Sequence, residues 1–91
     1  MSDTDYQKKF EKYSKVALKL NNVSNDDKLF LYAHYKQINF GNNDKDKPSL
    51  FNLVEKAKWN AWQNLANKDK NDCIKEYINK VKELYFKDKS S

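Results

Sequence analysis

LFLYAHYKQINFG, residues Leu29–Gly41, is the most apolar and aromatic run in an otherwise polar chain. Because residues three and four apart are neighbours on a helix, Tyr32, Tyr35 and Lys36 can share one helical surface here. An aromatic ring beside a fixed cation suits a ligand that has both a flat ring and a phosphate. A helix that is apolar on most sides is equally typical of a core helix packed between two neighbours. From these residues alone, both interpretations stay open.

Length and composition predict one small domain over residues 1–91. The chain has one Gly, one Pro and one Cys, so it cannot form an internal disulfide. The first residues contain no apolar signal segment, and no run approaches the roughly 20 apolar residues of a membrane span. We therefore expect a cytoplasmic monomer without stable membrane insertion.

The net charge of +5 favours a polyanionic partner, and all 18 basic residues are Lys. Codon bias accounts for most of this Lys- and Asn-rich composition. The lack of Arg weakens a nucleic-acid hypothesis, because Arg dominates bidentate recognition of bases and phosphates. The aromatic residues also fall on apolar stripes, which favours burial over base stacking. We expect no nucleic acid, and a module whose groove takes a partner helix stays as a further alternative.

Hydrophobic spacing predicts four helices and no strand, over about residues 1–21, 24–39, 52–66 and 69–86. The last helix has the strongest periodicity. Its apolar stripe comprises Ile74, Tyr77, Ile78, Val81, Leu84 and Tyr85. The first helix has a similar stripe, made of Tyr6, Phe10, Tyr13, Ala17 and Leu20. Trp59 and Trp62 in the third helix favour a core position over a ligand stack.

Capping residues predict where the helices begin and end. Thr4 and Ser24 each precede a polar partner three residues later, which is typical of a helix start. Asp69 is a good N-cap for the last helix. Gly41, the only glycine, lies where a C-cap residue with positive φ is expected.

A polar loop separates the second and third helices. It covers residues 42–48, and Pro48 prevents a helix from running through it. Leu50, Phe51 and Leu53 follow, and we expect them to anchor this segment to the body of the protein.

Few residues could catalyse a reaction. His34 is the only histidine and Cys73 the only cysteine, and nothing in the spacing brings them together. Cys73 is better explained as a small buried residue and His34 as a partly buried or surface residue. The sequence shows no metal-ligand cluster and no glycine-rich phosphate loop. We predict a binding protein with no catalytic and no metal-binding residues.

Several motifs together resemble the acyl-CoA-binding protein family. They are YAHYKQ at residues 32–37, Gly41, Pro48, KAKWNAW at residues 56–62 and YINKV at residues 77–81. Their order covers essentially the whole domain and is far more specific than any single lysine or tryptophan. The resemblance implies an all-α fold, an up-down-down-up four-helix bundle.

The resemblance also implies a function and a set of ligands. Members of this family bind fatty acyl-CoA esters without catalysis and without a cofactor. They transport and buffer medium- and long-chain esters and pass them transiently to acyl-CoA-using enzymes. We expect the same of this chain, with lysines and tyrosines holding the CoA head group and an apolar groove covering the acyl chain.

The matched motifs imply seven ligand-binding residues: Tyr32, Ala33, His34, Tyr35, Lys36, Lys58 and Tyr77. Tyr32 and Lys36 match the pair that holds the adenine and 3′-phosphate region. Lys58 matches the third-helix lysine at the head group, and Tyr77 the fourth-helix tyrosine on the nucleotide. On the second helix we expect Tyr32 and Lys36 to face the ligand, while Leu29 and Ala33 tie the helix to the core.

The chain departs from the family pattern at three places. Leu18 stands where members often have a first-helix lysine that approaches the ligand. Residues 22–24 replace a Lys-Pro pair, and residues 54–55 replace Lys-Gly. The number of phosphate-contacting lysines is therefore open, and we assign no site to Lys15, Lys19 or Val54.

Overall fold

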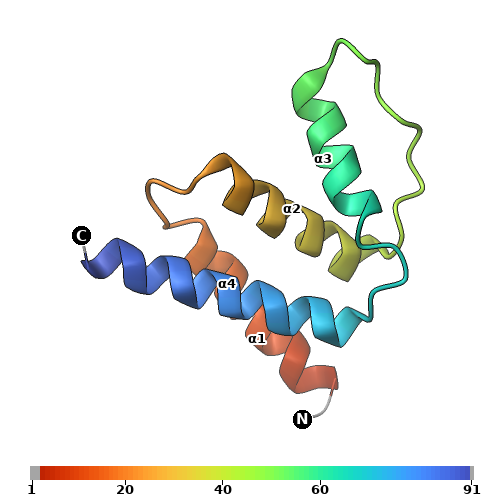
Figure 1. The fold of residues 1–91 in the computed structure, drawn as a ribbon. Helices are drawn as coiled ribbons and strands as arrows, with labels where there is room; N and C mark the ends of the chain where they lie inside the picture. Colours follow the sequence, from red (N-terminus) through yellow and green to blue (C-terminus); the bar gives the residue numbers. More distant parts are fainter. Residues whose placement is uncertain (1–2, 91) are drawn as a thin grey trace.

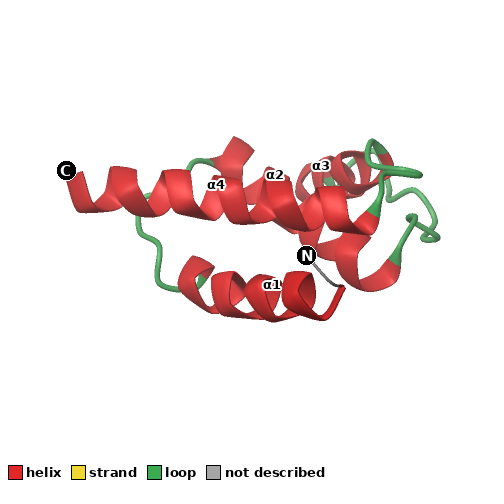
Figure 2. Ribbon diagram, turned by 90° about the horizontal axis from the view of Figure 1, so that it is seen from below, coloured by secondary structure: helices red, strands yellow, loops and turns green. Residues whose placement is uncertain are grey.

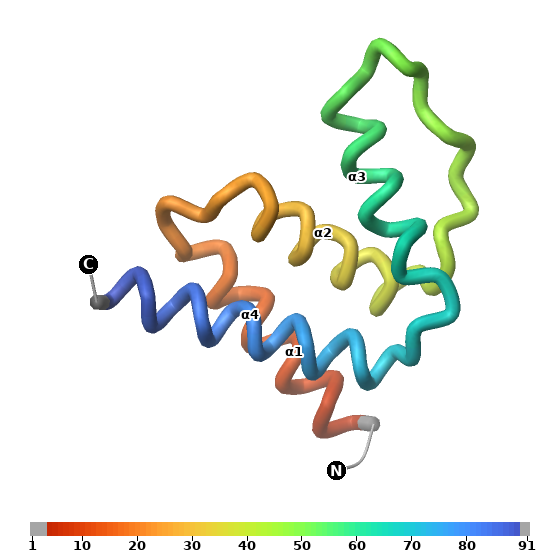
Figure 3. Tube along the Cα trace, viewed as in Figure 1, coloured from red at the N-terminus to blue at the C-terminus, as the bar shows by residue number. Residues whose placement is uncertain are grey.

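Residues 3–90 are described by a computed structural model, and they form four helices (Figure 1). These are α1 (Asp3–Ala17), α2 (Asn25–Phe40), α3 (Leu53–Gln63) and α4 (Lys70–Ser90). The chain trace shows α1 and α4 running in one general direction, whereas α2 and α3 run towards the opposite end (Figure 3). The predicted all-α, up-down-down-up arrangement is confirmed. Among these helices, none is both long and apolar enough to cross a bilayer.

Three of the four predicted capping residues are confirmed. The Ser24 side chain accepts a hydrogen bond from the Asp27 N–H at 3.1 Å. Asp69 accepts from the Asp72 N–H at 3.2 Å at the start of α4. Gly41 ends α2 with φ +76°, and its N–H donates to the Gln37 carbonyl at 3.0 Å. Thr4 is the exception: it lies inside α1, so it cannot act as an N-cap.

Two helices are shorter than predicted and one is longer. Helix α1 ends at Ala17 rather than residue 21, and a turn follows in which the Leu20 N–H donates to the Ala17 carbonyl at 3.2 Å. Asn22 then has φ 56°, which no helix continues through. Helix α3 ends at Gln63 rather than residue 66, and single hydrogen-bonded turns connect it to α4. Helix α4 is the longer one, because it extends to Ser90 instead of residue 86.

The core lies where α4 meets α1 and α2. Its buried members are Phe10, Ile38, Cys73, Ile74, Tyr77, Ile78 and Val81. The predicted stripe of α4 is confirmed except at Tyr85, which is exposed near the end of the helix. Figure 2 separates α1 from α4, while α2 lies behind α4 in this view. Phe10 on α1 also contacts Tyr35 on α2, with ring centroids 5.7 Å apart, so α1 and α2 meet beside α4.

Helix α3 packs against α2 alone among the described helices. Its main joint is Trp62, which is buried. The indole Nε1–H of Trp62 donates to the Gly41 carbonyl at 2.9 Å and to Gln37 Oε1 at 3.2 Å. The predicted core role is therefore confirmed for Trp62, whereas Trp59 is only half-buried. The N-terminal end of α3, away from Trp62, therefore projects from the other helices (Figure 1).

The predicted apolar anchors of the α2–α3 connection are wrong. Leu50, Phe51 and Leu53 are exposed. Polar contacts hold this connection instead: the Trp59 Nε1–H donates to the Lys45 carbonyl at 2.8 Å, and the Asn43 side chain donates to the Trp59 carbonyl at 3.3 Å. The apolar residues miss the core because they lie at the projecting end of α3, which only α2 supports.

Candidate functional site

The structure brings Tyr32 together with lysines from two helices. The Nζ atom of Lys58, on α3, lies 4.8 Å from the centre of the Tyr32 ring. The Nζ atom of Lys36, one turn further along α2, lies 5.8 Å from the same centre. Helical spacing explains the second contact and the packing of α3 on α2 explains the first. Three of the seven predicted residues therefore form one cluster.

Lys36 is held by aromatic faces. Its Nζ lies 4.8 Å from the Phe40 ring centre and 5.7 Å from that of Trp62, and no carboxylate within residues 3–90 pairs with it. Lys58 differs, because its ammonium lies 3.6 Å from Glu55 Oε1 on the same helix. Ring faces attract an ammonium without neutralising its charge. Lys36 is thus the more available of the two cations for an anion.

An apolar groove lies between α2 and α3 on one side of Tyr32. Its volume is about 430 Å³. The residues that line this α2–α3 groove are Asn25, Lys28, Leu29, Tyr32, Leu53, Val54, Ala57 and Lys58. Half of these lining residues have hydrocarbon side chains, and two are lysines. Such a surface suits an apolar chain attached to a charged group.

A second hollow lies between α1 and α2 on the other side of Tyr32, with a volume of about 570 Å³. We call it the tyrosine hollow, because Tyr32, Tyr35 and Tyr77 all line it. Tyr77 is buried, and its ring packs edge-on against Phe10 with centroids 5.1 Å apart. Burial, with a smaller contribution from Tyr35, raises the pKa of Tyr77 to about 12. Its hydroxyl therefore stays protonated at neutral pH and can donate a hydrogen bond.

Ala33 and His34 lie apart from these hollows. Ala33 is buried, as predicted, and neither residue lines the α2–α3 groove or the tyrosine hollow. The ring of His34 stacks on Phe30 with centroids 4.1 Å apart, and its Nδ1–H donates to the Phe30 carbonyl at 2.8 Å. Its Nε2 then accepts from the Lys68 ammonium at 3.2 Å. His34 thus ties α2 to the segment before α4.

The surroundings of His34 keep it neutral. Burial is the main cause that lowers its pKa, and the nearby Lys68 ammonium lowers it further. The Phe30 carbonyl and the Glu76 carboxylate, 3.9 Å from Nε2, act in the opposite direction without reversing the shift. A buried neutral ring with both nitrogens occupied is suited to holding the fold together.

The structure adds one residue to the site and moves another away from the core. Lys28 lines both the α2–α3 groove and the tyrosine hollow, yet sequence reasoning did not select it. The spacing Lys28, Tyr32, Lys36 could have found it, because steps of four form one row on a helix. Leu29 was expected to tie α2 to the core, and it is half-buried in the wall of the groove instead.

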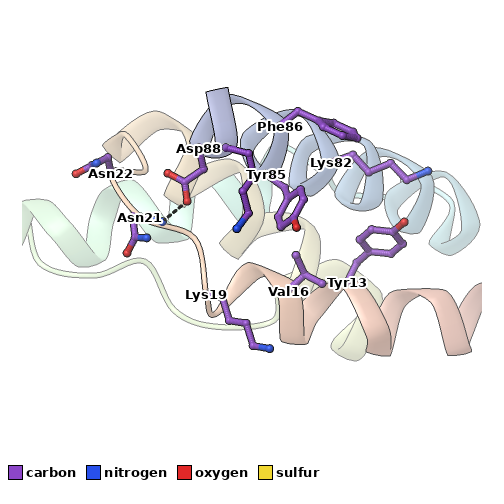
Figure 4. A pocket seen from close by; sticks show the side chains of 10 residues that line it. Tyr13, Val16, Lys19, Asn21, Asn22, Lys82, Tyr85, Phe86 and Asp88 are labelled. Atoms are coloured by element: carbon purple, nitrogen blue, oxygen red, sulfur yellow. Dashed lines mark hydrogen bonds between the residues drawn. The ribbon is translucent and has the colours of Figure 1, made fainter. Parts of the chain in front are cut away.

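A larger hollow of about 810 Å³ lies between the ends of α1 and α4 (Figure 4). None of the seven predicted residues lines it. The ammonium ends of Lys19 and Lys82 point apart in this view, and the Asn21 N–H donates to Asp88 Oδ2 at 3.1 Å. This hydrogen bond ties the segment after α1 to the end of α4 beside the hollow. Within residues 3–90, no group of three or more His, Cys, Asp or Glu side chains could hold a metal ion.

Comparisons with known proteins point to one family. The family model described as acyl CoA binding protein matches residues 3–81. An acyl-CoA-binding protein from Saccharomyces cerevisiae is 46% identical over 79 residues, which cover 86% of this chain and 91% of the relative.

Two solved structures are similar as well. The crystal structure of Oryza sativa Acyl-CoA-Binding Protein 2 superimposes with a TM-score of 0.89 at 38% identity, covering 94% of this chain and 97% of that one. The crystal structure of ACBP from Moniliophthora perniciosa, at 22% identity and a TM-score of 0.78, covers 100% of this chain and 98% of that one, and shows the same fold.

Proposed function

This chain belongs to the acyl-CoA-binding protein family, which binds acyl-CoA without catalysing a reaction, and from that premise we propose that it transports and buffers medium- and long-chain fatty acyl-CoA esters. The family match also means that acyl-CoA is a ligand and not a cofactor of a reaction. The chain length of the ester, the residues that hold it and the carrier role are the parts that need experiment.

One observation supports the assignment of the head group. Tyr32, with Lys36 and Lys58 within 6 Å of its ring centre, lies where the α2–α3 groove meets the tyrosine hollow. The pyrophosphate and 3′-phosphate of CoA carry about −4 in total. Lysines suit such groups as point charges, without the fork geometry of Arg. We infer that Tyr32, Lys36 and Lys58 hold the nucleotide, with Tyr35 and Tyr77 contributing from the tyrosine hollow.

Ala33 and His34 enter this proposal only indirectly. Both are buried against the fold and away from the hollows, so we infer that they support the position of Tyr32 and Lys36 on α2. Lys28 joins the ligand-binding set on the strength of its place at the edge of both hollows.

The α2–α3 groove is the proposed site of the acyl chain. Burial of apolar groups releases ~0.8 kcal/mol per CH₂, so a 16-carbon chain could gain roughly 10 kcal/mol before ordering costs. The acyl chain should therefore dominate affinity, while the head group sets orientation and specificity. The apolar side chains of Leu29, Leu53, Val54 and Ala57, which line the groove, support this division.

Isothermal calorimetry tests the proposal with ligands that differ only in the chain. We expect palmitoyl-CoA to bind far more tightly than free CoA, with affinity rising through a series of intermediate chain lengths. Free CoA with an affinity comparable to that of palmitoyl-CoA would contradict the assignment of the groove.

We further propose that the protein acts as a cytoplasmic monomer, passes its ligand transiently to acyl-CoA-using enzymes and binds no nucleic acid. Native mass spectrometry of protein purified under mild conditions tests the ligand and the stoichiometry together. A monomer mass with one acyl-CoA is the expected result. Co-purifying nucleic acid or a stable dimer would contradict this part of the proposal.

A further inference from the structure

Four apolar side chains are exposed to solvent at the projecting end of α3. Leu50, Phe51, Leu53 and Val54 are 68%, 95%, 73% and 69% exposed. We call them the tip surface. They occupy the end of the α2–α3 connection and the first turn of α3, the part of the chain farthest from α1 and α4 in Figure 1. Contiguous exposed apolar residues of this kind mark an interaction surface more often than a packing accident.

The tip surface is continuous with the α2–α3 groove. Leu53 and Val54 belong to both, since they line the groove and are exposed at its outer end. The groove therefore opens onto the tip. A fatty acyl chain that leaves a bilayer for this groove would pass over apolar side chains instead of through water, provided that the tip touches the bilayer.

We propose that the tip surface docks on a lipid bilayer and inserts shallowly, so that an acyl chain can move between the bilayer and the groove. This inference rests on the proposed function, because it assigns a role to the mouth of the same groove. Side chains such as Phe and Leu are the groups that enter the head-group boundary of a membrane. The docking is transient, because four side chains are a small anchor.

The charges around the tip predict how docking depends on the lipid. Lys45 and Lys47 in the α2–α3 connection are interspersed with Asp44 and Asp46, so this segment has no cationic excess. Two lysines line the groove, Lys28 and Lys58, and the Lys58 ammonium already pairs with Glu55. Docking should therefore depend chiefly on apolar insertion and only weakly on anionic lipid or salt.

A second copy of the chain fits the tip surface less well than a bilayer does. Specific protein interfaces take about 20–30 residues from each partner. The tip offers four apolar side chains at the end of a single helix, whereas a bilayer surface requires no matching shape.

The test uses the full chain and vesicles of phosphatidylcholine, with and without phosphatidylserine. The Leu50→Ser/Phe51→Ser double variant should bind both kinds of vesicle roughly tenfold or more weakly than the parent. It should also withdraw palmitoyl-CoA from loaded vesicles more slowly. Its affinity for octanoyl-CoA in lipid-free buffer should match that of the parent, because neither residue lines the groove.

Phe86→Ser is the matched control. Phe86 is 65% exposed near the C-terminal end of α4, and Figure 1 shows that end of α4 far from the start of α3. Its loss should therefore leave vesicle binding unchanged. The proposal would be overturned if the parent protein did not bind vesicles, or if the double variant bound them as tightly as the parent. A parent dimer that the double variant abolishes would overturn it too, since the tip would then bind a second copy. Failure of the proposed function is separate: the parent would bind no acyl-CoA in lipid-free buffer.

Discussion

At the scale of the residue, Lys36 is the side chain on which the head-group assignment depends most. It has aromatic neighbours and no carboxylate partner among residues 3–90, so its charge is available to a phosphate. We expect Lys36→Ala to weaken acyl-CoA binding by about 1.5–3 kcal/mol, the value of a charge-assisted hydrogen bond. Calorimetry with palmitoyl-CoA measures this loss.

Alanine variants of two further lysines show whether the loss of affinity depends on the position of the charge. Lys58→Ala should cost less, because the Lys58 ammonium already pairs with Glu55. Lys87→Ala, on the exposed last turn of α4, removes the same charge away from both hollows and should change affinity little. Equal losses in all three variants would show that net charge, not position, attracts the ligand.

His34 links stability to pH. Its pKa in the folded protein lies below the ordinary value of 6.5, so the unfolded chain binds the proton more readily. The stabilising contribution of neutral His34 is complete above about pH 6.5 and is lost as the pH falls towards the lower folded pKa. A protonated ring would also face the Lys68 ammonium.

We therefore expect the free energy of unfolding to fall between pH 7.5 and pH 5 more steeply in the parent than in His34→Gln. Urea unfolding at a series of pH values measures both curves, and the difference between them removes the contribution of the carboxyl groups. Parallel curves for the two proteins would contradict the role assigned to His34.

At the scale of the element, the starts of α1 and α2 allow a capping hydroxyl to be compared with a similar hydroxyl inside a helix. Ser24 accepts the Asp27 N–H, whereas Thr4 lies within α1. Ser24→Ala should lower the free energy of unfolding by about 1 kcal/mol. Thr4→Ala, a matched loss of an exposed hydroxyl, should change it by less than about 0.5 kcal/mol. Urea midpoints compare the two, and a larger effect at Thr4 would contradict the bounds of α1.

The joint between α2 and α3 is also a property of elements. Trp62 on α3 donates to Gly41 and Gln37 at the end of α2, so the two helices meet firmly at one end. At the other end they diverge around the α2–α3 groove. The groove therefore lies between the halves of α2 and α3 away from Trp62, next to the tip surface.

At the scale of the whole molecule, α3 is the element whose stability should respond to ligand. It packs on α2 alone, whereas α1, α2 and α4 share the core. An acyl chain in the groove would add contacts between α2 and α3, and ligand binding stabilises whatever it contacts. We expect palmitoyl-CoA to slow amide hydrogen exchange in α3 and residues 41–52 more than in α1.

Hydrogen exchange measured by mass spectrometry, with and without the ester, checks this expectation. Free CoA serves as the control, because it has the head group without the chain and should protect α3 less. Protection confined to α1 and α4 would place the ligand at the hollow of Figure 4 instead of the groove.

Much of the fold was predictable because it depends on local spacing. The stripe of α4 and the caps at Ser24, Asp69 and Gly41 are set by residues within a few positions of one another. The errors lie where no local rule applies. The ends of α1 and α3 were placed too late, because their last turns are limited by the path of the chain to the next helix.

The candidate site was predictable only through a pattern that spans three helices. Motif order selected Tyr32, Lys36, Lys58 and Tyr77, but it could not separate residues that line a hollow from buried neighbours such as His34. It also passed over Lys28, which lines both hollows. Which face of a helix meets solvent depends on what packs against it, and that partner is remote in sequence.

The sequence by itself determined an all-α fold, its family and a cluster of tyrosine and lysine on the second helix, because periodicity, capping and motif order are written along the chain. Only the tertiary structure decided that α3 packs on α2 alone, that a groove and a hollow meet at Tyr32, and that Leu50 and Phe51 are exposed to solvent. The physical reason is that burial and charge proximity arise between elements, from contacts that local spacing does not encode.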